Sequence, residues 1–206
     1  MANTSGAFGL RPINLAGGAP NSQGTNPYFI GSTASAIYQG SPVIAVNAGQ
    51  IAITGSASGD TYKHVGAFQG CEYVSSTTGK KVWSNFWPGS GYANTNFDIV
   101  GFVYDNPMQR FVLATDASFT NRATAKAAIF ESTQFSSGTS GSSVNGVSSA
   151  ALNVATLDNS NLSLPLKILG IYEDPMNQDF AAAGIQMVVM FNNHALLDAD
   201  SEGVVA

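Results

Sequence analysis

Short apolar runs separated by turn residues recur along most of this chain, and this spacing limits the fold more than any other feature. Each run is eight residues long or shorter, and this length suits strands rather than helices. Because the strands follow one another so closely, the pattern predicts a mainly β protein, built as a small antiparallel barrel or sandwich. The predicted strands cover residues 28–30, 43–46, 51–54, 65–68, 72–74, 82–86, 99–104, 110–114, 164–171 and 185–191.

Two hairpins are expected among these strands. Residues 99–104 alternate cleanly, with Ile99, Gly101 and Val103 on one face. The turn sequence Asp105-Asn106-Pro107 follows, so we expect residues 110–114 to pair with this strand. A second hairpin is expected near the C-terminus, between residues 164–171 and 185–191, because a turn-forming segment lies between them.

The chain divides into an arm, one β-rich domain and a tail. Residues 1–27 predict an extended N-terminal arm, because repeated Gly and Pro break any helix or long strand. Residues 28–197 are predicted to form a single domain, and residues 198–206 an acidic C-terminal tail. Within the domain, residues 120–130 favour one short helix capped by Thr120. The Ser/Gly-rich segment 136–149 is either an irregular loop or a linker.

The arm carries isolated apolar side chains, Phe8, Leu10 and Ile13, between its Gly and Pro residues. An arm of this kind docks on a neighbouring protein or folds back on its own domain. Both alternatives stay open on sequence grounds.

Charge is unusually scarce in this chain. Asp, Glu, Lys and Arg make up 10% of its residues, against about 25% in an ordinary soluble domain. The surface must therefore be either polar and uncharged or covered by partners. The net charge of −5, with eight Lys and Arg residues, disfavours binding to nucleic acid or to anionic membranes. The N-terminus lacks the features of a signal peptide, so we expect the protein either to be made and kept in a cytoplasm or to be carried out within a larger particle.

Motifs for catalysis, cofactors and metals are absent from the sequence. We find no G-x-S-x-G, Walker A or G-x-G-x-x-G motif. The two histidines, His64 and His194, are not at metal-ligand spacing, and Cys71 is the single cysteine. Cys71 lies in a predicted strand, which favours a buried, unreactive thiol. We therefore expect a protein that is not an enzyme and that binds neither a cofactor nor a metal.

One aromatic cluster stands out within fifteen residues. It contains Trp83, Phe86, Trp87, Tyr92 and Phe97, with several Asn residues between them. Aromatic rings beside amides can stack on sugars, which would make this a carbohydrate-binding site. Alternatively, the rings fill a core or a subunit interface, because each can bury about 150–250 Å². Exposed, coplanar Trp83 and Trp87 would favour the sugar site.

Several segments, taken in order along the chain, are similar to a family of structural proteins of tailed bacteriophages that are encoded near the major capsid protein. The segments are Gly6-Ala7-Phe8-Gly9-Leu10-Arg11-Pro12, Gly40-Ser41-Pro42-Val43, Val65-Gly66-Ala67-Phe68-Gln69-Gly70-Cys71-Glu72-Tyr73, Ser84-Asn85-Phe86-Trp87-Pro88, Val103-Tyr104-Asp105-Asn106-Pro107, Leu164-Pro165-Leu166-Lys167-Ile168-Leu169-Gly170-Ile171, Asp174-Pro175 and Asn192-Asn193-His194. Cys71 and the acidic extension after His194 depart from the family's pattern.

The resemblance implies a head decoration (cement) protein: a β-barrel with extended arms on the outer surface of an HK97-type capsid. It implies contact with the major capsid protein at capsomer junctions, and self-association as a trimer or dimer. The protein would be assembled in the host bacterial cytoplasm and reside on the phage head. Phe8, Leu10, Arg11, Pro12 and Ile13 would form the capsid-binding arm. The aromatic cluster would form an intersubunit interface.

Three other functions compete with this one. A carbohydrate-binding module would use the aromatic cluster as its platform. A tail or connector component of the virion is equally compatible with a small β-barrel. An enzyme would need a pocket holding His64 or His194 beside two carboxylates.

Overall fold

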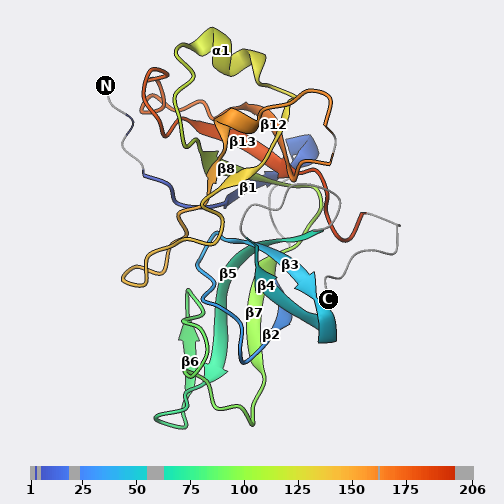
Figure 1. Ribbon diagram of the computed structural model, residues 1–206, viewed down its shortest axis with the longest axis vertical. Coiled ribbons are helices and arrows are strands. Elements are labelled where there is room, and N and C mark those ends of the chain that lie inside the picture. Colours follow the sequence, from blue (N-terminus) through green and yellow to red (C-terminus); the bar gives the residue numbers. More distant parts are fainter. Residues whose placement is uncertain (1–2, 4–5, 19–23, 55–62, 162, 198–206) are drawn as a thin grey trace.

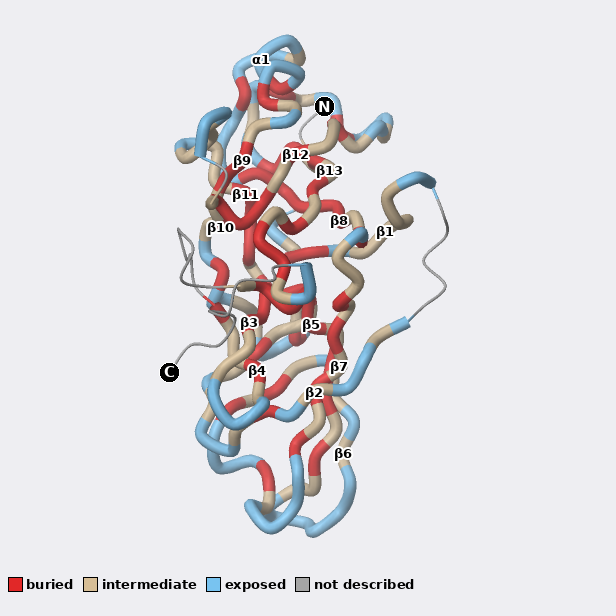
Figure 2. Tube along the Cα trace, turned by 90° about the vertical axis from the view of Figure 1, so that its right-hand side faces the viewer, coloured by how far each residue is buried: buried red, intermediate tan, exposed pale blue. Residues whose placement is uncertain are grey.

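The computed structural model describes residues 3, 6–18, 24–54, 63–161 and 163–197, and it is mainly β with one short α-helix, as the strand pattern predicts. The molecule is elongated and has two halves (Figures 1 and 2). We call the lower one the barrel half and the upper one the sheet half. The acidic tail predicted for residues 198–206 lies outside the described residues, as do parts of the predicted arm.

The barrel half is a closed ring of five strands with a sixth strand attached. Its strands are β2 (Asn26–Ile30), β3 (Pro42–Val46), β4 (Gln50–Ile53), β5 (His64–Val74), β6 (Lys81–Ser84) and β7 (Ile99–Tyr104). The order is β3-β4-β2-β7-β5, and β3 also pairs with β5, which closes the ring. β6 extends the sheet beyond β5. All of these pairs are antiparallel except β2 with β4, which is parallel. The 3-10 turn η2 (Asn47–Gly49) joins β3 to β4.

Alternation along β7 positions the barrel core. Ile99, Gly101 and Val103 are buried, and the residues between them face outward and are partly exposed. Gly101 is needed here, because a Cβ atom would lie within 3.0 Å of the Ile30 and Phe68 side chains. The interior is therefore packed to the point where one strand position has no room for a side chain. The main buried side chains of the barrel half are Ile30, Ile37, Val43, Ile51, Val65, Phe68, Cys71, Tyr73, Trp87, Ile99 and Val103.

The sheet half has a five-stranded antiparallel sheet in the order β1-β8-β13-β12-β9. Its strands are β1 (Arg11–Leu15), β8 (Gln109–Ala114), β9 (Ser132–Thr133), β12 (Leu166–Ile171) and β13 (Gln186–Phe191). Beside the sheet lie β10 (Phe135–Ser136), β11 (Ala151–Leu152), α1 (Arg122–Ala127) and the 3-10 turns η1 (Ala16–Gly18) and η3 (Val154–Thr156). β12 and β13 form the hairpin that the sequence predicts.

The sheet half has its own hydrophobic core, which is rich in aromatic side chains. The core includes Leu10, Ala67, Phe111, Leu113, Phe119, Phe135, Leu152, Leu166, Ile168, Phe180, Ile185, Met187, Val189 and Phe191. Ala67 belongs to β5, so this one strand contributes to both cores. The expectation of a single domain over residues 28–197 stays a prediction.

The predicted hairpin between residues 99–104 and 110–114 is wrong. β7 pairs with β2 and β5 in the barrel, whereas β8 pairs with β1 and β13 in the other sheet. Both edges of β7 are therefore already occupied. The turn between them carries the chain from one half to the other. Asp105 fixes its start by accepting hydrogen bonds from Asn26 Nδ2 at 2.9 Å and Tyr28 Oη at 2.6 Å.

Smaller corrections concern the strand limits and the helix. The two strands predicted at residues 65–68 and 72–74 are one continuous strand, β5, with a register shift between Phe68 and Gly70. The helix is shorter than predicted, and its cap is Asn121, whose side chain accepts a hydrogen bond from Thr124 N. Thr120 lies outside the helix with a φ of 68°.

The Ser/Gly-rich segment 136–149 is an irregular loop packed on the barrel, not a linker. Gly141 lies directly against the Tyr38 ring, which leaves no space for a Cβ atom. Asn85 Nδ2 donates a 2.8 Å hydrogen bond to Asn145 O. Gln39 and Val147 form a parallel bridge. The loop therefore connects the two halves through specific contacts.

Candidate functional site

The five aromatic side chains of the predicted cluster do not lie together. Trp87 is fully buried in the barrel half. Its ring meets Tyr73 edge-on, with 5.3 Å between the ring centres, and its Nε1 donates to Ala34 O at 3.2 Å. Trp83 is 66% exposed. A sugar site formed by Trp83 and Trp87 would need both rings to be exposed. Only Trp83 is exposed, so the structure does not contain that site.

The remaining three rings occupy separate places. Phe86 stacks on Tyr38, with ring centres 6.0 Å apart. Phe97 lines a shallow hollow together with the exposed Phe29. Tyr92 lies in the β6–β7 connection and is exposed.

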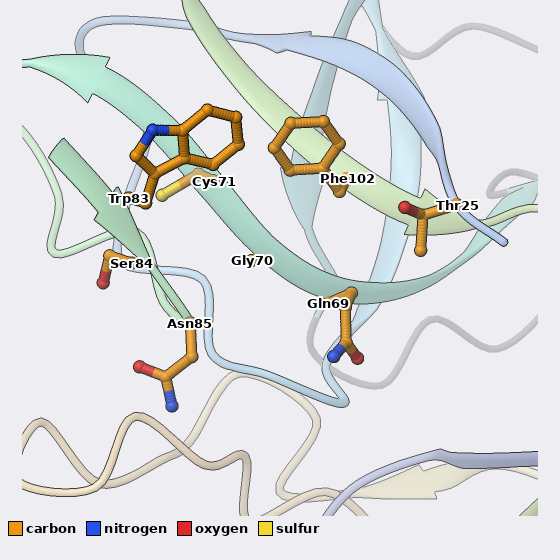
Figure 3. A pocket seen from close by; sticks show the side chains of 8 residues that line it. All are labelled: Thr25, Gln69, Gly70, Cys71, Trp83, Ser84, Asn85 and Phe102. Atoms are coloured by element: carbon orange, nitrogen blue, oxygen red, sulfur yellow. The ribbon is translucent and has the colours of Figure 1, made fainter. Parts of the chain in front are cut away.

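Trp83 pairs with the ring of Phe102, a contact that the sequence did not reveal. Its ring lies 5.8 Å from that of Phe102, with the two planes within 10° of each other. Figure 3 shows the two rings side by side with their faces turned the same way. We call this pair the aromatic platform. Strand register explains it, because Trp83 on β6 and Val100 on β7 both lie opposite Glu72 of β5, which puts Phe102 in the next outward row.

The platform belongs to a hollow of about 490 Å³ on the outer face of the barrel half. Its lining residues are Thr25, Gln69, Gly70, Cys71, Trp83, Ser84, Asn85 and Phe102 (Figure 3). None of these side chains is charged at neutral pH. Burial raises the pKa of Cys71 to about 12, so its thiol stays protonated, and Sγ donates to Phe86 O at 3.4 Å. The hollow thus combines two flat aromatic faces with neutral amides and hydroxyls.

A second hollow of about 310 Å³ adjoins the first, because Gln69 lines both. The others lining it are Phe8, Leu10, Arg11, Pro12, Gln39, Gly40, Tyr104 and Val147. Four of the five predicted arm residues, Phe8, Leu10, Arg11 and Pro12, therefore line a hollow of their own that shares Gln69 with the first. Arg11 is exposed, and its guanidinium carbon lies 4.3 Å from the centre of the Phe8 ring.

The predicted arm residues are attached to the protein's own sheet. β1, which contains Arg11, Pro12 and Ile13, is an edge strand paired with β8. Leu10 is 3% exposed, lies in the core of the sheet half and donates its backbone N–H to Gly40 O at 2.8 Å. Leu10 is therefore an internal anchor and is not available to a partner in this conformation. Phe8, Pro12 and Ile13 remain partly exposed.

The two histidines meet where the halves join. His64 opens β5, His194 follows β13, and the two residues form a parallel bridge. Both are buried, and His64 Nδ1 lies 3.0 Å from Asn193 Oδ1. Burial lowers the pKa of each histidine to about 4. Both imidazoles are therefore uncharged at neutral pH.

The described residues contain neither a metal-binding cluster nor a membrane-spanning helix. That part of the chain holds no group of three or more His, Cys, Asp or Glu side chains arranged to bind a metal ion. It also holds no helix that is long and apolar enough to cross a membrane.

Comparisons with protein-family models, with curated proteins and with solved structures found no match to this chain. The candidate site therefore rests on its own geometry. Sequence reasoning singled out Trp83 but missed Phe102, Gln69 and Thr25. The alternation of β7 indicated that Phe102 faces outward, but nothing in the sequence gave the order β6-β5-β7 that puts it beside Trp83.

Proposed function

We propose that this chain is a structural virion protein that binds the outer surface of an HK97-type phage capsid and stabilises its capsomer junctions. Several sequence segments resemble those of phage head proteins and occur in the same order along the chain, which supports this proposal. The scarcity of charge also supports it, because 10% charged residues leave much of the surface without the groups that keep free proteins apart.

The observation that carries the proposal is the number of exposed aromatic rings on the barrel half. Phe29, Trp83, Tyr92 and Phe97 are each at least half exposed. Single exposed apolar residues are normal. Four large aromatics on one half of a chain so poor in charge indicate a surface that partners cover, because aromatic residues are enriched at protein interfaces.

The outer edge of β1, which among the described strands pairs with β8 alone, is the contact that we assign to the major capsid protein. Leu10 and the pairing with β8 hold this strand in place, so binding would not have to order a flexible segment first. Pro12 on an edge strand costs no ladder hydrogen bond. The exposed Arg11 guanidinium can pair with a carboxylate on the coat protein. We assign self-association, as a trimer or dimer, to the exposed Phe29, Tyr92 and Phe97.

Binding to purified heads that lack this protein tests the proposal. We expect saturable co-sedimentation of the wild-type chain, and a loss of about tenfold or more in affinity for the double variant Phe8→Ala/Arg11→Ala. The matched control is Phe130→Ala, which removes an aromatic ring that is 69% exposed on the sheet half. Wild-type protein that does not bind heads would overturn the capsid assignment. A double variant that binds as tightly as the control would overturn the β1 contact.

A position in the tail or connector is the alternative within the virion. A density map of the intact particle distinguishes the two, because decoration requires many copies on the head surface. Copies confined to the tail or to the portal vertex would replace the decoration role with the alternative.

A further inference from the structure

We propose that the aromatic platform of Trp83 and Phe102 is a binding site for a neutral, hexose-based glycan. This ligand site is additional to the capsid contact at β1 and does not depend on it. It also differs from the sugar site suggested by Trp83 and Trp87, because Trp87 is buried.

The shape of the platform fits a sugar ring. One face of a pyranose presents several C–H bonds, and these pack against the negative face of an aromatic ring. The Trp83 and Phe102 planes are within 10° of each other and their centres are 5.8 Å apart. Two neighbouring rings of an oligosaccharide can therefore lie across two parallel aromatic faces, which are both open to the hollow in Figure 3.

The polar groups beside the platform fit sugar hydroxyls. Within the described part of the chain, the Gln69 amide and the Thr25 hydroxyl have no hydrogen-bond partner, although both line the hollow. An amide offers two donors and an acceptor, and a hydroxyl offers both. A few such groups around an apolar floor are typical of ligand sites. Since none of the lining side chains is charged, a neutral ligand is favoured over an acidic one.

Nucleobases are the first competing occupant, because they too stack on aromatic rings. Binding of a single strand also requires a positive groove for its phosphates. One ammonium, Lys81 Nζ, is 5.1 Å from the centre of the Trp83 ring, but it is paired with Glu72 at 2.8 Å. With a net charge of −5 for the chain, this surface attracts no polyanion.

A second copy of the chain is the other competing occupant. A dry protein interface over the platform would also cover the Lys81–Glu72 pair, whose lysine side chain is 56% exposed. Removing such a pair from water carries a desolvation penalty. Lysine on an edge strand also opposes pairing with another strand edge, and Lys81 lies on the edge strand β6. A glycan leaves both groups hydrated.

The test is a titration of the purified full-length chain with neutral oligosaccharides, namely maltohexaose, cellohexaose and chitohexaose. Binding is followed by tryptophan fluorescence and by ligand-observed NMR. Trp83 is exposed and Trp87 is buried, so the fluorescence change reports on the platform. We expect saturation by at least one of these sugars, with a dissociation constant on the order of 1 mM.

Three variants make the result specific. Trp83→Ala should weaken binding by about tenfold or more, because it removes one of the two stacking faces. Gln69→Leu should weaken binding several-fold, because it keeps the volume and removes the amide. Phe130→Ala is the matched control, since it removes an aromatic ring of similar exposure on the sheet half, and it should bind as the wild type does. Circular dichroism checks that each variant is folded.

Four results would overturn the proposal. They are the absence of saturable binding to any of the three sugars, binding that Trp83→Ala leaves unchanged, tighter binding of oligothymidylate than of the sugars, and a Trp83-dependent dimer in sedimentation experiments. Each differs from a failure of the capsid assignment, which is measured on heads with substitutions at Phe8 and Arg11.

Discussion

The two halves of this protein distribute their aromatic side chains differently. The sheet half buries Phe111, Phe119, Phe135, Phe180 and Phe191 in its core and exposes Phe130. The barrel half keeps Phe68, Tyr73 and Trp87 inside and exposes Phe29, Trp83, Tyr92 and Phe97.

The difference follows from the space inside each half. A closed five-stranded ring encloses little room, to the point that one β7 position must be Gly101. The barrel strands accordingly turn Phe29, Trp83 and Phe102 outward, and β5 places only Phe68 and Tyr73 among its aromatic rings inside. An open sheet covered on one face by loops and a helix can take more rings into its core. The sheet half is thus expected to supply stability, and the barrel half to supply binding surface.

Aromatic truncation in each half tests this comparison most directly, and it should give the largest effect. Phe111→Ala empties a fully buried position of the sheet half and should cost about 3–5 kcal/mol of unfolding free energy. Phe29→Ala removes a ring that is 50% exposed on the barrel half and should cost less than about 1 kcal/mol. Urea denaturation measures both. Equal losses would break the comparison, because the exposed rings would then be structural.

Acid should act on the junction between the halves. Burial lowers the folded-state pKa of His64 and of His194 from 6.5 to about 4. The unfolded chain therefore binds protons first as the pH falls below 6.5. The stability present above pH 6.5 is lost progressively down to about pH 4, by about 3 kcal/mol for His64 alone.

Denaturation midpoints between pH 8 and pH 4 measure this loss, and His64→Gln should flatten the profile. Other groups near the histidines are Asn193, whose Oδ1 accepts from His64 Nδ1, and Asp105, whose charge partly opposes the lowering of the pKa of His194. A profile that is identical in the His64→Gln variant would assign the acid sensitivity to carboxylates instead.

The contact between the loop 136–149 and the barrel half should have a middle-sized effect. In Gly141→Ala, the new methyl group would overlap the Tyr38 ring, and the required shift should cost about 1–3 kcal/mol. Gly170→Ala is the matched control, since nothing lies within 4 Å of its Cβ position. Thermal unfolding of both variants measures the difference. If Gly141→Ala is as stable as the control, the loop does not help to join the halves.

The smallest expected effect is on the surface of the barrel half. Lys81→Ala breaks the ion pair with Glu72 beside the platform, and it should change the unfolding free energy by about 0–1 kcal/mol. Added salt should reduce even this difference, because the pair is partly exposed. Urea denaturation at low and high salt measures it. A loss that persists at high salt would show that the lysine stem contributes by packing on Trp83.

Sequence reasoning predicted much of the local secondary structure and less of how the strands pair into sheets. Alternation identified β7 correctly, and the turn between β12 and β13 correctly predicted their hairpin. β1 was missed as a strand because Pro12 argues against one, although an edge strand tolerates proline. The hairpin of β7 with β8 was predicted wrongly, since a tight turn also suits a chain that passes between two sheets.

For the candidate site, sequence reasoning found individual residues but not their neighbours. Trp83 was singled out, yet its partner Phe102 lies nineteen positions away and depends on a strand order that local patterns do not encode. Trp87 could not be distinguished from Trp83 for a similar reason. Trp83 is the second residue of the predicted strand 82–86 and Trp87 directly follows that strand, so local pattern did not indicate which of the two is inside.

The long strand β5 has a mechanical consequence. It runs along the long axis of the molecule (Figure 1), with Ala67 in one core and Phe68 in the other. A pull on the lower end of the barrel half would therefore be transmitted along β5 to the junction with the sheet half. The backbone hydrogen bonds of β5 to β3 and β7 would resist such a pull by sharing the load rather than opening one at a time.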